Sequence, residues 1–127
     1  MNDGRPAPGL DSLPVQAIDL AMDGEHRDFE RARLDSASFA SGRVTRPTLQ
    51  PGWKWSDSVG KSRGVEKCTA PHLGYVIAGA MVVRVADGPE YRYRSGDAYA
   101  VSPEPHDAWV DGDETYVAID VALPGLG

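Results

Sequence analysis

After Ser36 the sequence alternates short runs of β-branched and aromatic residues with Gly, Pro and Asp, and no other feature constrains the fold as strongly. Runs of this kind, separated by turn residues, are typical of short strands. No convincing amphipathic helix is visible in this part of the chain. The pattern predicts strands over residues 42–49, 73–85 with a break at Gly79, 91–94, 98–101, 108–110 and 115–121. We therefore expect an all-β domain, either a sandwich or a small barrel.

The chain before Ser36 lacks this pattern. From Met1 to about Leu13 it consists mostly of Gly, Pro, Asp, Asn and Ser, which predicts a loose tail. Between Val15 and Leu34 the pattern is ambiguous, and residues 16–22 could form a short helix or a strand. We expect residues 1–35 to be a tail and a loosely structured arm, and residues 36–123 to be the β domain. The arm is a candidate contact segment in a homodimer.

Composition excludes several classes of protein. The chain has 127 residues, with 13 basic and 19 acidic side chains and a formal charge of -6. No cluster of Lys or Arg stands out, which argues against nucleic-acid binding. The chain is long enough to form a core without a metal, and its single cysteine cannot form an internal disulfide. No segment approaches the length needed to span a membrane, and residues 1–20 do not resemble a signal peptide, so we expect a cytoplasmic protein.

Four potential metal ligands lie in two segments of the expected β domain. Glu66 and Cys68 are two residues apart, hence on the same face of a strand, and a Thr-Ala-Pro corner lets His72 return toward that face. His106 follows a Gly-Asp turn further along the chain. These residues offer three or four ligands and leave room for water or substrate. Sulfur, nitrogen and oxygen together suit Zn, Fe(II), Ni or Cu rather than Mg or Ca.

The spacing of these residues resembles the first motif of the cupin superfamily, G(X)5HXH(X)3,4E(X)6G. Read from Gly60, Glu66 and Cys68 stand where the two histidines would be, His72 stands where the glutamate would be, and Gly79 closes the motif. Cys68, His72 and His106, with Glu66 as a further ligand or as a general base, are therefore the candidate metal site.

The second cupin motif, G(X)5PXG(X)2H(X)3N, is matched approximately. Gly96 opens it, Pro103 and Pro105 lie near its proline, and His106 comes one residue early with no Asn after it. Residues 51–56, 68–75 and 105–110 also resemble a group of small single-domain bacterial cupins, and the resemblance covers about residues 43–121. Against this narrower template Gly52 could be the first glycine of the motif, which would make residues 56–64 an inserted loop.

This resemblance implies a jelly-roll barrel that often holds a divalent metal at its mouth. Isomerase, cyclase, lyase and dioxygenase chemistries all occur in the superfamily, and the fold alone does not select one. The leading hypothesis is thus a metal-dependent enzyme for a small organic molecule. A non-catalytic binding or sensory module is the alternative, because the ligand set departs from three histidines and a glutamate.

Each candidate ligand also has a structural interpretation. Cys68 could be a small buried hydrophobe, His72 a core histidine, His106 a cap on a Pro-rich turn, and Glu66 a solvated edge residue. For His72 and His106, their joint occurrence at motif positions favours ligation, whereas both interpretations stay open for Cys68 and Glu66.

The aromatic residues are open to the same two interpretations. Trp53 and Trp55 alternate, so their rings share one side and could bind a ligand, close the barrel end or form a dimer contact. Tyr99 and Trp109 are candidate ligand-binding residues that could instead pack in the core. Tyr75 is a candidate proton donor with the same alternative.

Overall fold

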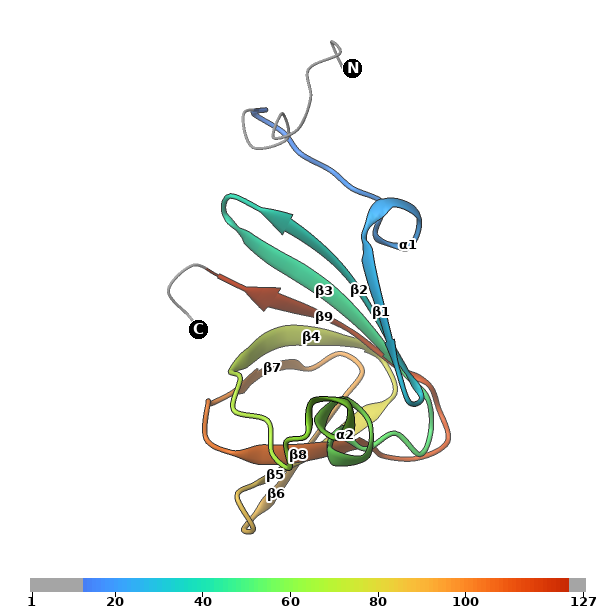
Figure 1. The fold of residues 1–127 in the computed structure, drawn as a ribbon, viewed down its shortest axis with the longest axis vertical. Helices are drawn as coiled ribbons and strands as arrows, with labels where there is room; N and C mark the ends of the chain where they lie inside the picture. Colours follow the sequence, from blue (N-terminus) through green and yellow to red (C-terminus); the bar gives the residue numbers. More distant parts are fainter. Residues whose placement is uncertain (1–12, 124–127) are drawn as a thin grey trace.

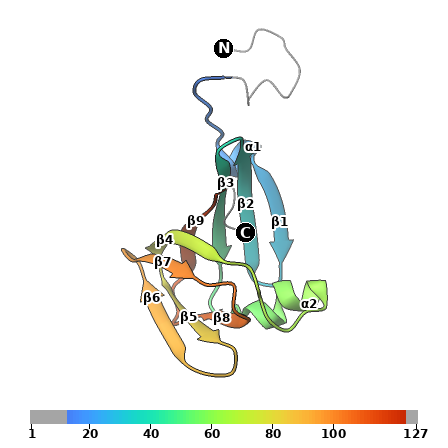
Figure 2. The same ribbon diagram turned by 90° about the vertical axis from the view of Figure 1, so that its left-hand side faces the viewer.

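The computed structural model describes residues 13–123, and the first twelve residues of the expected tail lie outside the described part. The chain forms two antiparallel sheets that face one another (Figures 1 and 2). The large sheet has six strands in the order β1-β2-β3-β9-β4-β7, and the small sheet has three in the order β6-β5-β8. The all-β fold expected from the sequence is confirmed.

The large sheet contains strands from both ends of the described chain: β1 (Glu25–Phe29), β2 (Ala32–Phe39), β3 (Gly42–Leu49), β4 (His72–Ala78), β7 (Ala98–Val101) and β9 (Tyr116–Ala122). The small sheet contains β5 (Ala80–Val85), β6 (Glu90–Arg94) and β8 (His106–Val110). The helices are short: α1 (Leu20–Asp23), the 3-10 helix η2 (Trp55–Asp57) and α2 (Val59–Arg63). None of the helices within residues 13–123 is long and apolar enough to cross a membrane.

Gly79 is the point at which the chain leaves the large sheet for the small one. The break predicted there falls between β4 and β5, and Gly79 has a φ of 81°. A Cβ at this position would lie 2.9 Å from the backbone oxygen of Thr115, so a side chain would be crowded as well as strained. Glycine thus allows one continuous apolar segment to serve both sheets.

The β structure begins at Glu25, eleven residues before the expected start of the domain at Ser36. Strand β1 pairs with β2 from Glu25 opposite Ser36 to Phe29 opposite Ala32. Residues 25–35 therefore belong to the large sheet rather than to a loose arm. Because β1 is an edge strand, four of its five residues are exposed. These residues are mostly charged, so the sequence shows no alternation of apolar and polar residues that would predict a strand.

The core lies between the two sheets. Tyr116 and Val76 are almost fully buried, and they pack with residues of β5 and β8 such as Met81 and Val110. Trp53, in the connection after β3, completes this cluster. Burial of these apolar side chains, rather than any single polar contact, holds the sheets together.

A buried carboxylate joins the first three strands on the other face of the large sheet. Asp35 of β2 is 3% exposed. Its oxygens lie 2.5 Å from His26 Nδ1, 2.9 Å from Arg33 Nε and 3.5 Å from Arg46 Nη2. Burial alone would raise the pKa of Asp35, but hydrogen bonds from Arg33, then from His26 and Arg46, outweigh it, and the pKa lies below its usual value.

Residues 56–64, which the narrower cupin template treats as an insertion, contain α2 and most of η2. Hydrogen bonds from two serine hydroxyls are among those that attach this segment to the rest of the fold. Ser58 Oγ donates to the backbone oxygen of Glu30 at 2.7 Å, and Ser56 Oγ donates to Asp107 of β8 at 2.7 Å. The segment is thus an ordered part of the fold, in contrast to the absence of helices expected after Ser36.

Candidate metal centre

Cys68, His72 and His106 meet where the two sheets come together. Their potential ligand atoms all lie within 4.8 Å of one another. His72 begins β4 of the large sheet and His106 begins β8 of the small sheet. Cys68 precedes β4 and pairs with His106 through two backbone hydrogen bonds of 2.8 and 2.9 Å. The pairing of Cys68 with β8 therefore brings the two sequence motifs together.

The hydrogen bonds of the histidines define which ring nitrogens face the cluster. His106 Nδ1 donates to the backbone oxygen of Glu104 at 2.9 Å, which leaves the lone pair of Nε2 available to a metal. His72 Nε2 lies 3.7 Å from Cys68 Sγ, whereas its Nδ1 faces Asp120 Oδ2 at 3.9 Å. The two rings meet edge to face, with centroids 5.4 Å apart.

Burial favours the neutral protonation states of His72 and Cys68 in the cluster. Burial, with a smaller effect of the neighbouring His106, lowers the pKa of His72 to about 4. Burial also raises the pKa of the Cys68 thiol, against the opposing effects of the Ala70 backbone N–H and of the Arg63 charge. Neutral imidazole is the form that ligates metals, and a cation would compensate a buried thiolate.

Asp120 of β9 lies beside the His72 ring nitrogen that faces away from Cys68 Sγ. Burial raises the pKa of its carboxyl to about 7. With His72 neutral and 3.9 Å away, the two side chains are not an ion pair at neutral pH. The Tyr99 hydroxyl donates a hydrogen bond to Asp120 Oδ1, and the Tyr99 ring stacks on Tyr93 at 4.5 Å.

A cavity of about 400 Å³ opens beside the cluster. All three candidate ligands line it, together with Asp120 and apolar or aromatic side chains from both sheets. Trp53, Trp55 and Tyr99, which the sequence analysis selected as ligand-binding residues, are among them. Trp53 Nε1 is the one buried side-chain polar atom that has no hydrogen-bond partner within the described residues.

The donor set fits a divalent transition metal. Ligand atoms at about 2.0–2.3 Å from a tetrahedral Zn²⁺ lie roughly 3.5 Å from one another. The 3.7 Å between Cys68 Sγ and His72 Nε2 agrees with this spacing. One thiolate and two imidazoles are ligands of borderline softness, which suits Zn, Fe(II), Ni and Cu. With only three protein ligands beside a cavity, a metal held here would have a coordination position available to a small molecule.

Three other predicted site residues lie outside this arrangement. Glu66 is exposed and belongs neither to the cluster nor to the cavity wall, so the structure does not bring it together with the other candidate ligands. The segment before Cys68 is not a strand, and the expected alternation of Glu66 and Cys68 does not apply. Tyr75 is 51% exposed on β4 and is not part of the cavity wall. Trp109 is also absent from the wall, and the Lys54 ammonium lies 5.6 Å from its ring.

Sequence reasoning missed Asp120, Tyr93 and Arg63, which all line the cavity. A signal existed for Asp120, because it is a charged residue within the apolar strand β9, where an unpaired charge is costly. Tyr93 alternates with arginines in β6. This alternation indicated that Tyr93 lies on the opposite face of the strand from the arginines, but not that its face borders the cavity. Arg63 comes from the segment taken as a loop, and no local pattern indicated its position.

Comparison with known proteins gives similarities of fold only. No protein-family model matches the chain, and no curated protein matches it in sequence. Among solved structures, the polyketide cyclase RemF from Streptomyces resistomycificus has a TM-score of 0.60 at 17% identity, covering 86% of this chain and 79% of that protein. KdgF from a Halomonas species has a TM-score of 0.57 at 18% identity, covering 79% and 86%.

A cupin-like protein from Thermotoga maritima gives a similar result, with a TM-score of 0.56 at 16% identity over 82% of this chain and 80% of that protein. At these identities the likeness concerns the arrangement of strands. Together with the two antiparallel sheets, it confirms the architecture that the two motifs predicted. The chain is a small protein with the cupin-type fold.

Proposed function

We propose that this protein is a metal-dependent enzyme that acts on a small organic molecule inside its cavity. The observation that carries the proposal is the convergence of Cys68, His72 and His106 at the wall of a mainly apolar cavity. These three side chains would hold Zn, Fe(II), Ni or Cu. Such a metal supplies Lewis-acid polarisation of a substrate oxygen or, for iron and copper, redox chemistry.

The surrounding residues supply binding and proton transfer. Trp53 and Trp55 offer aromatic surface against which a planar molecule can stack. Asp120 offers a carboxylate at the cavity wall, the role that the sequence analysis gave to Glu66, and the Tyr99 hydroxyl orients it. The apolar wall limits the access of water. Isomerase, cyclase, lyase and dioxygenase reactions are all compatible with this set, and the similarity to a polyketide cyclase favours testing cyclisation first.

Metal analysis of protein purified without an affinity tag tests the proposal. We expect about one transition-metal ion per chain, since one three-ligand site is present. The double substitution Cys68→Ser, His72→Ala should remove it. His26→Ala is the matched control, because this histidine lies on β1 outside the cluster. Metal content far below one per chain that the double substitution leaves unchanged would contradict the proposal.

A non-catalytic binding module that holds a small molecule in the same cavity is the second candidate. Trp53 lines the cavity, and its buried, unpartnered N–H would be satisfied by an acceptor atom of a bound molecule under both functions. A sensory module would retain its ligand unchanged, whereas an enzyme would release a product. Mass spectrometry of molecules extracted from the purified protein, before and after incubation with added candidate substrates, separates the two.

A further inference from the structure

We propose that the cavity takes an organic carboxylate with an aromatic or apolar body, and that Arg63 of α2 binds its acid group. This inference deepens the proposed function, because it names the class of molecule that the same cavity accepts. It rests on the charge of the cavity wall and on the position of α2, neither of which requires a metal.

The charged groups of the wall favour an anion. Two arginines, Arg43 and Arg63, line the cavity, and Asp120 is the only carboxylate among the described residues that do. Arg43 is already engaged, since its guanidinium lies 3.0 Å from Glu25 Oε1 and 2.5 Å from Ser38 Oγ. Arg63 makes no ion pair within residues 13–123. An incoming anion therefore meets one available guanidinium.

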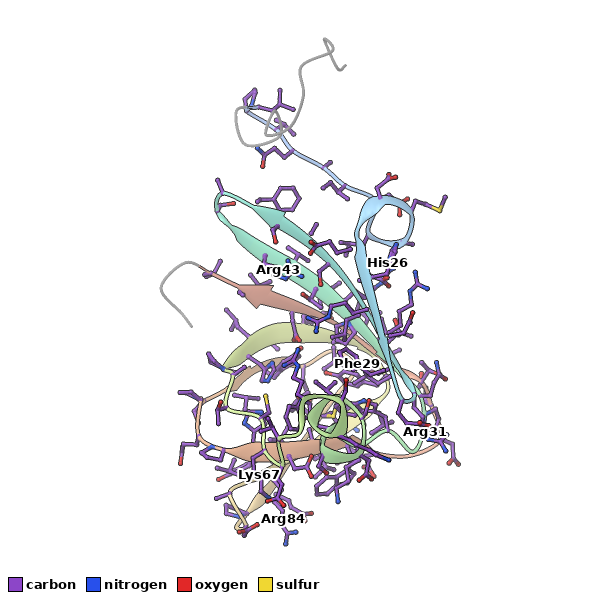
Figure 3. All side chains as sticks on the ribbon, in the orientation of Figure 1. His26, Phe29, Arg31, Arg43, Lys67 and Arg84 are labelled. Carbon is purple, nitrogen blue, oxygen red and sulfur yellow. The ribbon has the colours of Figure 1, made fainter. Side chains whose placement is uncertain are left out.

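The two arginines lie at different places on the cavity. Figure 3 shows Arg43 on the part of the large sheet nearer α1, while α2, labelled in Figure 1 in the same orientation, lies lower in that view. Arg63 lies five residues before Cys68 in the chain, and both residues line this cavity together with His72 and His106. A carboxylate bound to Arg63 would thus place the rest of a small molecule near Cys68, His72 and His106.

Helix α2 is fixed closely against the cavity wall. A Cβ on Gly60 would lie 2.6 Å from Trp55 Cζ3, so only glycine allows the helix to sit this close to the indole. Val59 is 5% exposed and lines the cavity beside it. Gly64, with a φ of 71°, ends the helix and donates its backbone N–H to Gly60 and Lys61. Arg63 is therefore presented by an anchored turn rather than by an open loop.

The chemistry of the guanidinium and the other residues of the cavity wall indicate which kind of acid would bind. The planar guanidinium donates two parallel hydrogen bonds to a carboxylate or a phosphate, and its single positive charge matches the single negative charge of a carboxylate better than the larger charge of a phosphate. Because the protein carries a formal charge of -6, an anion gains little from the overall field and depends on this local cation. Trp53, Trp55 and Tyr93 provide aromatic surface for the body of the molecule.

Isothermal titration calorimetry of the full-length protein with benzoate, and with its uncharged analogue benzamide, tests the inference. We expect benzoate to bind at least about tenfold more tightly, since a charge-assisted hydrogen bond contributes about this factor. Arg63→Gln should weaken benzoate binding about tenfold and leave benzamide binding unchanged. Arg63→Lys should retain part of the affinity, because it keeps the charge but loses the planar pair of donors. Circular dichroism verifies the fold of each variant.

Lys61→Gln is the matched control, because it removes the same charge from the same helix but lies outside the cavity wall. It should change benzoate affinity by less than about twofold, since exposed charges are screened. Equal losses in the Lys61 and Arg63 variants, equal binding of benzoate and benzamide, or no benzoate binding at millimolar concentration would each overturn the inference.

Metal content measured in the same samples separates this inference from the proposed function. Arg63-dependent preference for benzoate in protein that holds no metal would support the inference and contradict the metal-dependent enzyme. A full complement of metal with no preference for benzoate would do the reverse. Benzoate binding that His72→Ala abolishes and Arg63→Gln leaves unchanged would assign the carboxylate to the metal and overturn the role of Arg63.

Discussion

His72 has a different partner on each ring nitrogen, and this determines what it can do. Its Nε2 faces Cys68 Sγ, and its Nδ1 faces Asp120, which in turn accepts a hydrogen bond from Tyr99. A carboxylate beside the second nitrogen of a ligating histidine orients the ring and increases its basicity. If His72 ligates a metal as proposed, Asp120 would act on that metal through His72, although the two residues belong to different strands.

Asp120→Asn should weaken metal binding about tenfold while leaving the three ligands in place. The substitution keeps the shape of the side chain but removes the carboxylate that faces His72 Nδ1. Competition titration with a chromogenic chelator measures the dissociation constant. Tyr99→Phe serves as the control, because it removes a donor to Asp120 but keeps the carboxylate, and its effect should be smaller. An unchanged dissociation constant in Asp120→Asn would show that the carboxylate has no orienting role.

Asp35 predicts a dependence of stability on pH. Its folded-state pKa lies below the usual value near 4 because of Arg33, His26 and Arg46. The resulting stabilisation is fully present above the unfolded-state pKa and is lost as pH falls through the lower, folded-state pKa. Asp35→Asn should therefore lower the free energy of unfolding by about 2 kcal/mol at neutral pH.

Urea denaturation of wild type and Asp35→Asn across the acid range measures this dependence. The difference between the two proteins should begin to shrink below about pH 4, where the carboxyl of the unfolded chain takes up a proton, and should be lost as pH falls through the lower pKa of the folded state. Asp113→Asn is a suitable control, because Asp113 is exposed in the turn before β9. A difference in stability that is the same at neutral and acid pH would indicate that packing, not charge, explains the effect.

Individual strands could be predicted from the sequence because their pattern is local. The expected segments 42–49 and 98–101 coincide with β3 and β7. The break at Gly79 falls where the chain passes from the large sheet to the small sheet. The edge strand β1 was missed because its exposed, charged residues show no apolar alternation. The contact of β4 with β9 places Asp120 opposite Gly74 and beside His72. Such pairing between distant segments leaves no local signal, so the sequence indicated the three residues of the cluster but not their carboxylate neighbour.

Two glycines at element boundaries allow the energetic cost of backbone strain to be distinguished from the cost of steric crowding. Gly79 and Gly96 both have positive φ values, 81° and 93°. A Cβ on Gly79 would lie 2.9 Å from backbone atoms of Thr115 and Tyr116, whereas nothing lies within 4 Å of one on Gly96. Gly96→Ala should cost about 1 kcal/mol from the left-handed backbone alone. Gly79→Ala should lower the free energy of unfolding by about 3 kcal/mol, because steric crowding where the chain passes between the sheets adds to the backbone strain.

Denaturant unfolding of the two alanine variants provides the comparison. The difference between them measures how tightly the chain is held as it passes from β4 to β5. Equal losses of stability would mean that β9 can shift to accommodate a side chain at residue 79, and the exchange point would then be less rigid than the contacts indicate.

At the scale of the whole molecule, the candidate ligands connect the two sheets. His72 belongs to the large sheet, His106 to the small sheet, and Cys68 to the connection that pairs with β8 (Figure 2). A metal bound only by the folded chain stabilises it in proportion to its excess over the dissociation constant. The homodimer and the cytoplasmic location expected from the sequence stay predictions. The metal, by contrast, would have a direct effect on the stability of the single chain.

Removal of the metal should therefore lower the melting temperature of the entire domain in one transition. At a hundredfold excess over the dissociation constant, a bound metal contributes about 2.7 kcal/mol, which corresponds to roughly 10 °C for a domain of this size. Differential scanning calorimetry of metal-loaded and chelator-treated protein measures the shift. The His72→Ala, His106→Ala variant should melt at the same temperature with and without metal. If its melting temperature still rose with added metal, the stabilising ion would be bound elsewhere, and the junction of the two sheets would not be the metal centre.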